Sequence, residues 1–205
     1  MKINYLILFI LLIFSAGCAS TKKSAHPHYP QPPEDYLSDC NYLTKEEKAV
    51  IYYLNYVRKN PQEFCEGYVK PYIPSFKDDD FDERKASLIA LLSSLEANSE
   101  PDLQPDETLY ELARCLAVKS GELGLTGHDR SQTGCAPLTG VSGECCDYGN
   151  ATGLEIVLSL LVDAGANNAA MGHRIICLNP RYTKIGVSIQ PHIIFKNNAV
   201  IDFMM

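Results

Sequence analysis

The stretch GHRIICLNPRYTKIGV, residues 172–187, decides the fold that we expect for this chain. Its first part predicts a short helical turn over Asn167–Ile176, which carries His173. Its second part begins a strand, because apolar side chains alternate with small or polar ones from Ile185 to Ile189. A turn at residues 196–198 leads into a second apolar run at 200–203. The C-terminus therefore predicts an antiparallel hairpin.

Helical patterns fill the chain before this stretch. Thr44 and Glu47 have the spacing of a capping box, which predicts a helix that ends near Asn60-Pro61. The acidic run at residues 77–83 suits the N-terminus of a helix that carries Leu88 to Leu95. Other helices are expected at Pro61–Tyr68, Asp106–Ser120 and Gly153–Val162. Helices followed by a hairpin predict an α+β domain with helices packed on a sheet.

The N-terminus predicts export. A lysine precedes an apolar run at residues 5–14, and the small residues Ser15, Ala16 and Gly17 stand directly before Cys18. This pattern is typical of a secretory signal peptide, and it resembles a bacterial lipoprotein processing site. We expect residues 1–17 to be the signal peptide and Cys18 to carry the lipid, which would hold the protein to a membrane. Plain secretion after cleavage nearby is the alternative.

Residues 18–40 form a proline-rich tether, and residues 41–205 are long enough for one compact domain with its own core. His26 and His28 lie in the tether and are expected to be solvated. The chain has a formal net charge of −7. This acidic balance argues against nucleic acid as a partner.

Seven cysteines remain after Cys18, which at this density in an exported domain favours disulfides over metal–thiolate sites. Their number is odd, so one thiol stays free or pairs between chains. Cys145 and Cys146 are neighbours and can hardly bond each other, so at least one of them is expected to reach a distant partner.

Three glycine-flanked islands carry the candidate functional residues: Gly127-His128, Gly143-Glu144 and Gly172-His173. Neutral imidazoles are good ligands for a borderline metal, and a carboxylate can orient an imidazole or hold a water. We expect the three side chains to share one cleft. The alternative is that both histidines are structural and bond loop carbonyls, with Glu144 as their buried partner.

These blocks occur in the order of a known family. The earlier blocks are Leu54-Asn55-x-x-Arg58-x-Asn60-Pro61 and Leu103-x-x-Asp106-x-x-Leu109-x-x-x-Ala113, and the last island continues into Leu178-Asn179-Pro180-x-x-Thr183-x-Ile185-Gly186-Val187. The chain therefore resembles the CAP superfamily, the cysteine-rich secretory, antigen 5 and pathogenesis-related proteins with SCP-like domains. This resemblance implies an α-β-α sandwich with a small central antiparallel sheet flanked by helices.

The resemblance also implies a central cleft lined by His128, Glu144 and His173, in which the two histidines bind zinc or another divalent cation. Many family members have a second acid, for which Asp163 is the nearest candidate. Asp163 either fills that role or caps a helix end in solvent. The chain departs from the family where Cys145 replaces the usual Asn after Gly-Glu, and it has no Trp.

Three functions stay open on this basis. The first is a binding module, tethered in the bacterial cell envelope on the periplasmic or the outer surface, that holds a small ligand, a lipid or an envelope protein. The second is a metal-assisted hydrolase with Glu144 as general base and the two histidines as metal ligands. The third is a structural component of an envelope complex. No serine stands in a nucleophile-elbow setting, so binding is favoured.

Overall fold

The structure, a computed structural model, describes residues 30–96, 102–165 and 171–205. The expected signal peptide, Cys18, the tether up to residue 29 and residues 167–170 of the expected last helical turn lie outside the described residues. In the described ranges, no helix combines the length and the apolar composition that crossing a bilayer requires.

The helices begin and end close to the predicted positions. The first helix, α1 (Lys45–Lys59), starts at the predicted capping box, in which Thr44 Oγ1 accepts from the Glu47 amide at 3.3 Å and the Glu47 carboxylate accepts from the Thr44 amide at 2.7 Å. The other helices are α2 (Pro61–Phe64) with a π-helical turn at Cys65–Val69, α3 (Phe81–Ser94), α4 (Glu107–Leu123), α5 (Gly153–Val162) and α6 (Gly172–Cys177).

Four strands form one sheet in the order β1-β3-β4-β2. The predicted hairpin is confirmed as β3 (Lys184–His192) and β4 (Lys196–Met204). The sequence patterns did not predict β2 (Ser142–Tyr148), which pairs antiparallel with β4. The sheet is mixed rather than wholly antiparallel, because β1 (Gln104–Pro105) runs parallel to β3 on its way into α4.

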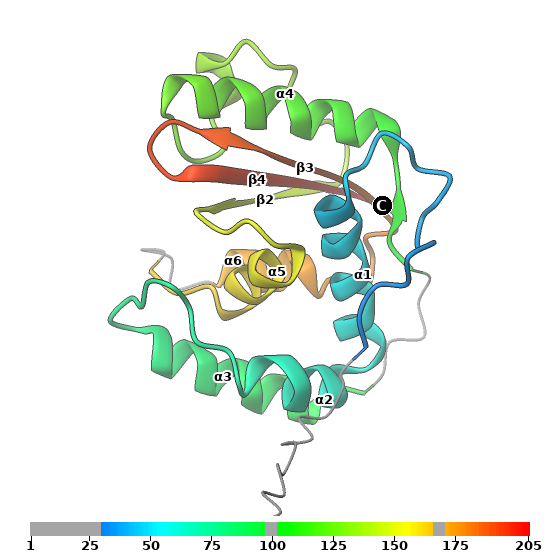
Figure 1. The fold of residues 1–205 in the computed structure, drawn as a ribbon, viewed down its shortest axis with the longest axis vertical. Coiled ribbons are helices and arrows are strands. Elements are labelled where there is room, and N and C mark those ends of the chain that lie inside the picture. The colour runs from blue at the N-terminus through cyan, green and yellow to red at the C-terminus, as the bar shows by residue number, and fades with distance from the viewer. Residues whose placement is uncertain (1–29, 97–101, 166–170) are drawn as a thin grey trace, which may run out of the picture.

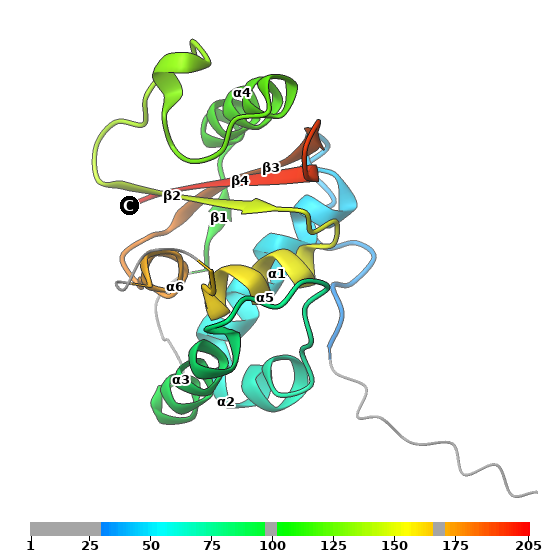
Figure 2. The same cartoon turned by 90° about the vertical axis from the view of Figure 1, so that its left-hand side faces the viewer.

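The elements stack in layers, with the sheet between helices (Figure 1). The long helix α4 covers one face of the sheet, and α1, α5 and α6 cover the other (Figure 2). Helices α2 and α3 lie beyond α5, on the side away from the sheet. The predicted α-β-α sandwich is therefore confirmed, with an additional helical layer.

Alternation along the strands separates two apolar clusters. Ile185 and Val187 of β3 point into the main core, which α1 and α5 complete. Gly186 faces α4, where a Cβ would lie 2.2 Å from the carbonyl carbon of Leu109. Only a glycine at this position lets the helix approach the strand so closely. The packing distance between α4 and the sheet thus depends on one residue of the deciding stretch.

One disulfide, Cys115–Cys135, joins α4 to the loop that follows it. Cys40, Cys65, Cys145, Cys146 and Cys177 are free thiols. Neither Cys145 nor Cys146 forms the predicted disulfide, although the Cys145 thiol does reach a distant cysteine, because it is hydrogen-bonded to the Cys177 thiol. The two point to opposite faces of β2, and the sulfur of Cys146 contacts the Gly127 carbonyl and the His128 ring instead.

Candidate functional site

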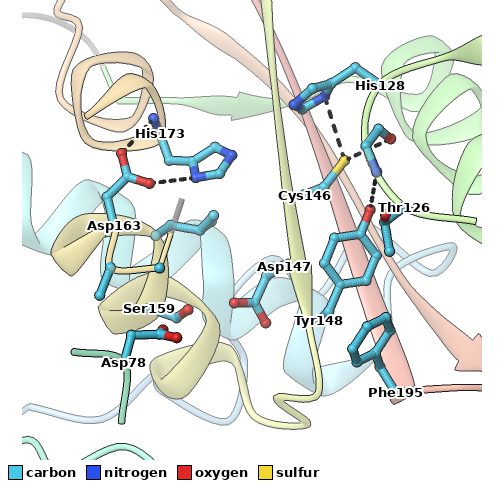
Figure 3. Close-up of a pocket in the computed structure, with 14 residues that line it drawn as sticks. Asp78, Thr126, His128, Cys146, Asp147, Tyr148, Ser159, Asp163, His173 and Phe195 are labelled. Atoms are coloured by element: carbon cyan, nitrogen blue, oxygen red, sulfur yellow. Dashed lines mark hydrogen bonds and ion pairs between the residues drawn. The ribbon is translucent and has the colours of Figure 1, made fainter. Parts of the chain in front are cut away.

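The fold brings the two island histidines together. His128 lies in the loop after α4, and His173 lies in the first turn of α6, on the other side of the sheet edge formed by β2. The centroids of the two imidazole rings are 6.3 Å apart. Their side chains point toward each other across the cavity shown in Figure 3. Residues that are 45 positions apart in the chain therefore meet at one place.

Asp163 holds the ring of His173. Its carboxylate accepts from the His173 amide at 3.1 Å and lies 2.8 Å from His173 Nδ1. Asp163 ends α5 in the left-handed conformation, with φ of 56°, which a residue with a side chain adopts only at a cost. Burial would raise the pKa of Asp163, but the hydrogen bonds and charge of His173 outweigh it and lower the pKa. Asp163 is buried, so the alternative of a helix cap in solvent is wrong; the residue ends α5 and at the same time orients His173.

Glu144 holds the ring of His128 in the same way. Glu144 Oε1 lies 2.8 Å from His128 Nδ1. The carboxylate is almost buried, with 8% of its side chain exposed, whereas 53% of the His128 side chain is exposed. The histidine ring therefore reaches solvent, while the buried glutamate fixes its orientation through Nδ1.

Arg130 is the site residue that the sequence patterns missed. Its guanidinium donates to Glu144 Oε2 from Nε at 3.0 Å and to Asp202 Oδ2 at 2.9 Å. Asp202 lies directly opposite Glu144 in the register of β4 against β2. Only the pairing of these strands brings the two carboxylates together, so no local signal in the chain identifies Arg130 as their shared partner.

The two carboxylates carry unequal charge because they share one guanidinium. Burial and the negative charge of Glu144 raise the pKa of Asp202 to about 8, although Arg130 opposes the rise. Burial also acts to raise the pKa of Glu144, but hydrogen bonds from His128 and Arg130 lower it overall. Burial and the neighbouring Glu144 therefore favour the protonated form of Asp202, whereas the hydrogen bonds to Glu144 favour its ionised form.

Cys146 is a second site residue that the sequence patterns missed, and it lies beside His128. Its Sγ is 3.7 Å from His128 Nδ1 and 3.7 Å from the Gly127 carbonyl oxygen. Glu144 and Cys146 are two positions apart on β2, so both face the histidine. This two-residue spacing is the sequence signal that could have identified Cys146 as a site residue. Burial raises the pKa of the Cys146 thiol, so the thiol is protonated and is not a nucleophile.

A cavity of about 580 Å³ opens between the two histidines. Phe195 lines the end away from the histidines, and Asp147 and Tyr148 lie between (Figure 3). Glu144 does not line this cavity. It lines an adjoining hollow on the other side of His128, together with Arg130. The three predicted residues therefore form one cluster, but only the histidines face the main cavity.

Asp147 is a buried acid in the cavity wall. It accepts from Asn150 Nδ2 at 2.9 and 3.0 Å, and burial raises its pKa from 3.8 to about 6. The folded protein therefore holds this proton more tightly than the unfolded chain does. The stability that the proton contributes is complete below the unfolded pKa and is lost as the pH rises through the folded pKa.

Replacing Asp147 with asparagine should remove this loss. Between about pH 4 and pH 8, the wild type should lose up to about 3 kcal/mol more unfolding free energy than the Asp147→Asn variant loses. Urea denaturation across this pH range measures the difference. The exposed Glu122→Gln substitution is the control and should follow the wild type. Parallel pH profiles for Asp147→Asn and the wild type would contradict the expectation.

The geometry can hold a metal ion between the rings. In each imidazole, Nδ1 is engaged by a carboxylate, and among the described residues no hydrogen bond reaches either Nε2. A tetrahedral metal with bonds of about 2.0–2.1 Å to two imidazoles holds the bonded nitrogens about 3.3 Å apart. The two ring centroids are 6.3 Å apart, so a small approach of the side chains would let both Nε2 atoms reach one ion. Carboxylates behind ligating histidines fix the ring orientation and raise the basicity of the ligand.

Comparisons with known proteins give structural neighbours only. No protein-family profile matches the chain, and no curated protein matches it. An outer surface protein from Borrelia burgdorferi is 22% identical, with a TM-score of 0.36, over 60% of this chain and 86% of that one. Schistosoma mansoni venom allergen-like protein 4 is 13% identical, with a TM-score of 0.46, over 78% and 88%.

NaASP2, solved with Zn²⁺, is 10% identical, with a TM-score of 0.46, over 80% of this chain and 82% of that one. Each neighbour is similar to this chain at low sequence identity.

Proposed function

We propose that this protein is an exported, lipid-anchored CAP-type binding module of the bacterial envelope, whose cleft holds a divalent cation between His128 and His173. The observation that carries the proposal is the paired support of the two rings: Glu144 lies 2.8 Å from Nδ1 of His128, and Asp163 lies 2.8 Å from Nδ1 of His173. In each ring the other nitrogen is left for a ligand. The cation would supply a Lewis acid for a polar group of the bound molecule.

The anchor is the part of the proposal that rests on sequence. The small residues before Cys18 support lipid attachment at that cysteine. Labelling with a fatty-acid analogue in a bacterial host should mark the wild type and leave the Cys18→Ser variant unmarked. Equal labelling of both would rule out this anchor and leave secretion.

The surroundings of Glu144 favour binding over hydrolysis. A general base needs a free oxygen and a pKa near the working pH. Both oxygens of Glu144 are engaged, one by His128 and the other by Arg130, and its pKa is lowered. The carboxylate is therefore suited to orienting an imidazole rather than to accepting a proton from water.

The size and lining of the cavity support a small ligand or the head group of a larger one. A volume of about 580 Å³ lies in the range of sites that hold small molecules. Asp147 and Asp163 provide polar contacts near the imidazoles, and Tyr148 and Phe195 provide an aromatic wall. A lipid or an envelope protein could place one polar group at the cation in this arrangement.

Removing either ring should weaken Zn²⁺ binding. We expect His128→Ala and His173→Ala each to lower the affinity at least about 100-fold, because one ligand cannot hold the ion alone, and Asp163→Asn to lower it about 10–100-fold. Competition with a chromophoric chelator measures these affinities. The His26→Gln/His28→Gln double variant in the tether is the matched control and should bind like the wild type. Unchanged affinity in His173→Ala, or a loss confined to the tether variant, would contradict the proposed site.

A further inference from the structure

Three donor atoms of different chemistry meet at Nδ1 of His128. His128 Nδ1, a Glu144 carboxylate oxygen and Cys146 Sγ all lie within 4.8 Å of one another. The sulfur is 3.7 Å from Nδ1, and Glu144 Oε1 is 2.8 Å from Nδ1. We propose that these atoms form a second metal site, which takes a soft, thiophilic ion such as Cu⁺ or Cd²⁺.

The backbone sets this group in place before any ion arrives. Glu144 and Cys146 project from the same face of β2 because they are two positions apart. The loop that carries His128 is fixed by the Gly127 amide, which donates to Tyr148 Oη at 2.8 Å. The disulfide Cys115–Cys135 ties the far end of the loop to α4. A preorganised set of ligands loses little conformational freedom when it binds an ion.

The distances suit one ion. With bonds of about 2.0–2.1 Å to nitrogen and about 2.3 Å to sulfur, two ligands of a tetrahedral ion lie about 3.3–3.8 Å apart. The separation of 3.7 Å between Cys146 Sγ and His128 Nδ1 falls in this range. The contact of 2.8 Å between His128 Nδ1 and Glu144 Oε1 is a hydrogen bond. An ion at Nδ1 would replace the proton in this contact and open it slightly, and the proton would move to Nε2 of the same ring.

The sulfur determines which ion binds. Thiolate selects soft metals, whereas two neutral imidazoles suit a borderline ion such as Zn²⁺. Binding at Cys146 releases the thiol proton to solvent, since a thiol ligates as the thiolate. An ion that bonds sulfur strongly offsets this cost best. Soft ions should therefore choose the cysteine side of His128, and borderline ions the side that faces His173.

The positive charge of Arg130 does not prevent an ion from reaching this site. Arg130 donates to the other oxygen of Glu144 and to Asp202, so Glu144 Oε1 still faces His128. The exposed His128 side chain gives an ion a path from solvent. The ion would bond Nδ1 of this ring, whereas the cation of the proposed function would bond Nε2. The two sites therefore use different nitrogens of one ring, and a neutral ring serves one ion at a time.

Cadmium titration tests the second site directly. Adding Cd²⁺ to the purified protein should produce the ultraviolet charge-transfer absorption of a cadmium–thiolate bond, which saturates near one equivalent. The Cys146→Ser variant should lack this absorption, and Glu144→Gln should bind Cd²⁺ at least about tenfold more weakly. His173→Ala should keep the absorption in full, although it should lose Zn²⁺, so the two sites can fail independently.

Two other cysteines provide matched controls. Cys40→Ser, at a partly exposed free thiol, and Cys18→Ser, at the expected lipid site, should both keep the absorption. Circular dichroism checks that each variant is folded, and Cys146→Ala replaces Cys146→Ser if the latter is not. Three results would overturn the second site. The absorption could persist in Cys146→Ser, it could be lost in Cys40→Ser, or the wild type could fail to show it.

Discussion

Replacing Arg130 with alanine should lower the unfolding free energy by about 3–5 kcal/mol, which is the cost of leaving the buried Glu144 carboxylate without its charged partner. The guanidinium has 8% of its side chain exposed and bonds both Glu144 and Asp202. It also donates to the carbonyl oxygens of Leu112 at 3.0 Å and Ala136 at 3.2 Å. Without Arg130, the carboxyl groups of Glu144 and Asp202 lose their shared donor, and two carbonyls lose theirs.

Urea denaturation at neutral pH measures this loss. Arg114→Ala is the matched control, because Arg114 is half exposed and its nearest acid, Glu111, lies 3.7 Å away. An exposed ion pair of this kind contributes up to about 1 kcal/mol. The Arg130→Ala variant should also bind Zn²⁺ more weakly, since Glu144 would no longer be held beneath His128. Equal losses of unfolding free energy in Arg130→Ala and Arg114→Ala would show that the buried network stabilises the fold no more than an exposed ion pair does.

Replacing Arg174 with methionine should cost about 3 kcal/mol or more, although methionine keeps most of the apolar stem. The guanidinium donates to the carbonyl oxygens of Leu161 at 2.6 Å and Val162 at 2.9 Å. These carbonyls belong to the last turn of α5, where helix carbonyls have no partner within the helix. Arg174 also reaches α3, where it donates to the Arg84 carbonyl at 3.0 Å. One side chain therefore joins α6, α5 and α3.

The same urea experiment tests this second loss. Arg181→Met, at an exposed position shortly after α6, is the control and should change stability by no more than about 0.5 kcal/mol. Arg174 directly follows His173, so the variant should also lose Zn²⁺ affinity as α6 shifts. Wild-type stability in Arg174→Met would mean that water satisfies the end of α5 and that the arginine is dispensable.

Local signals were sufficient for the helices and the hairpin. The capping box at Thr44 and the alternation around Ile185 depend on neighbours within a few positions, so the chain shows them directly. Strand β2 was not predicted, because its sequence SGECCDY lacks a run of branched apolar residues. It is a strand because β4 supplies its hydrogen bonds along the whole length from Ser142 to Tyr148.

The residues of the candidate site also fall into two groups, those that local sequence patterns identify and those that only the folded structure brings in. The glycine-flanked motifs were enough to select His128, Glu144 and His173 as candidates, and the family resemblance added Asp163 as the candidate for a fourth residue. Their partners could not be predicted, because each contact crosses between elements. Arg130 bonds Asp202 across 72 positions, and Cys146 meets His128 only because β2 returns beneath the loop after α4.

By itself, the sequence determined the helices, the C-terminal hairpin, the α+β class and the identity of the candidate residues. Each of these depends on side-chain periodicity, capping or turn chemistry, which act over a few residues. The tertiary structure alone decided that Glu144 lies behind His128, that Asp163 orients His173, and that Arg130 and Cys146 join the cluster. Hydrogen bonds and buried charges act between atoms about 3–4 Å apart, whatever the distance along the chain, and only the folded backbone sets those separations.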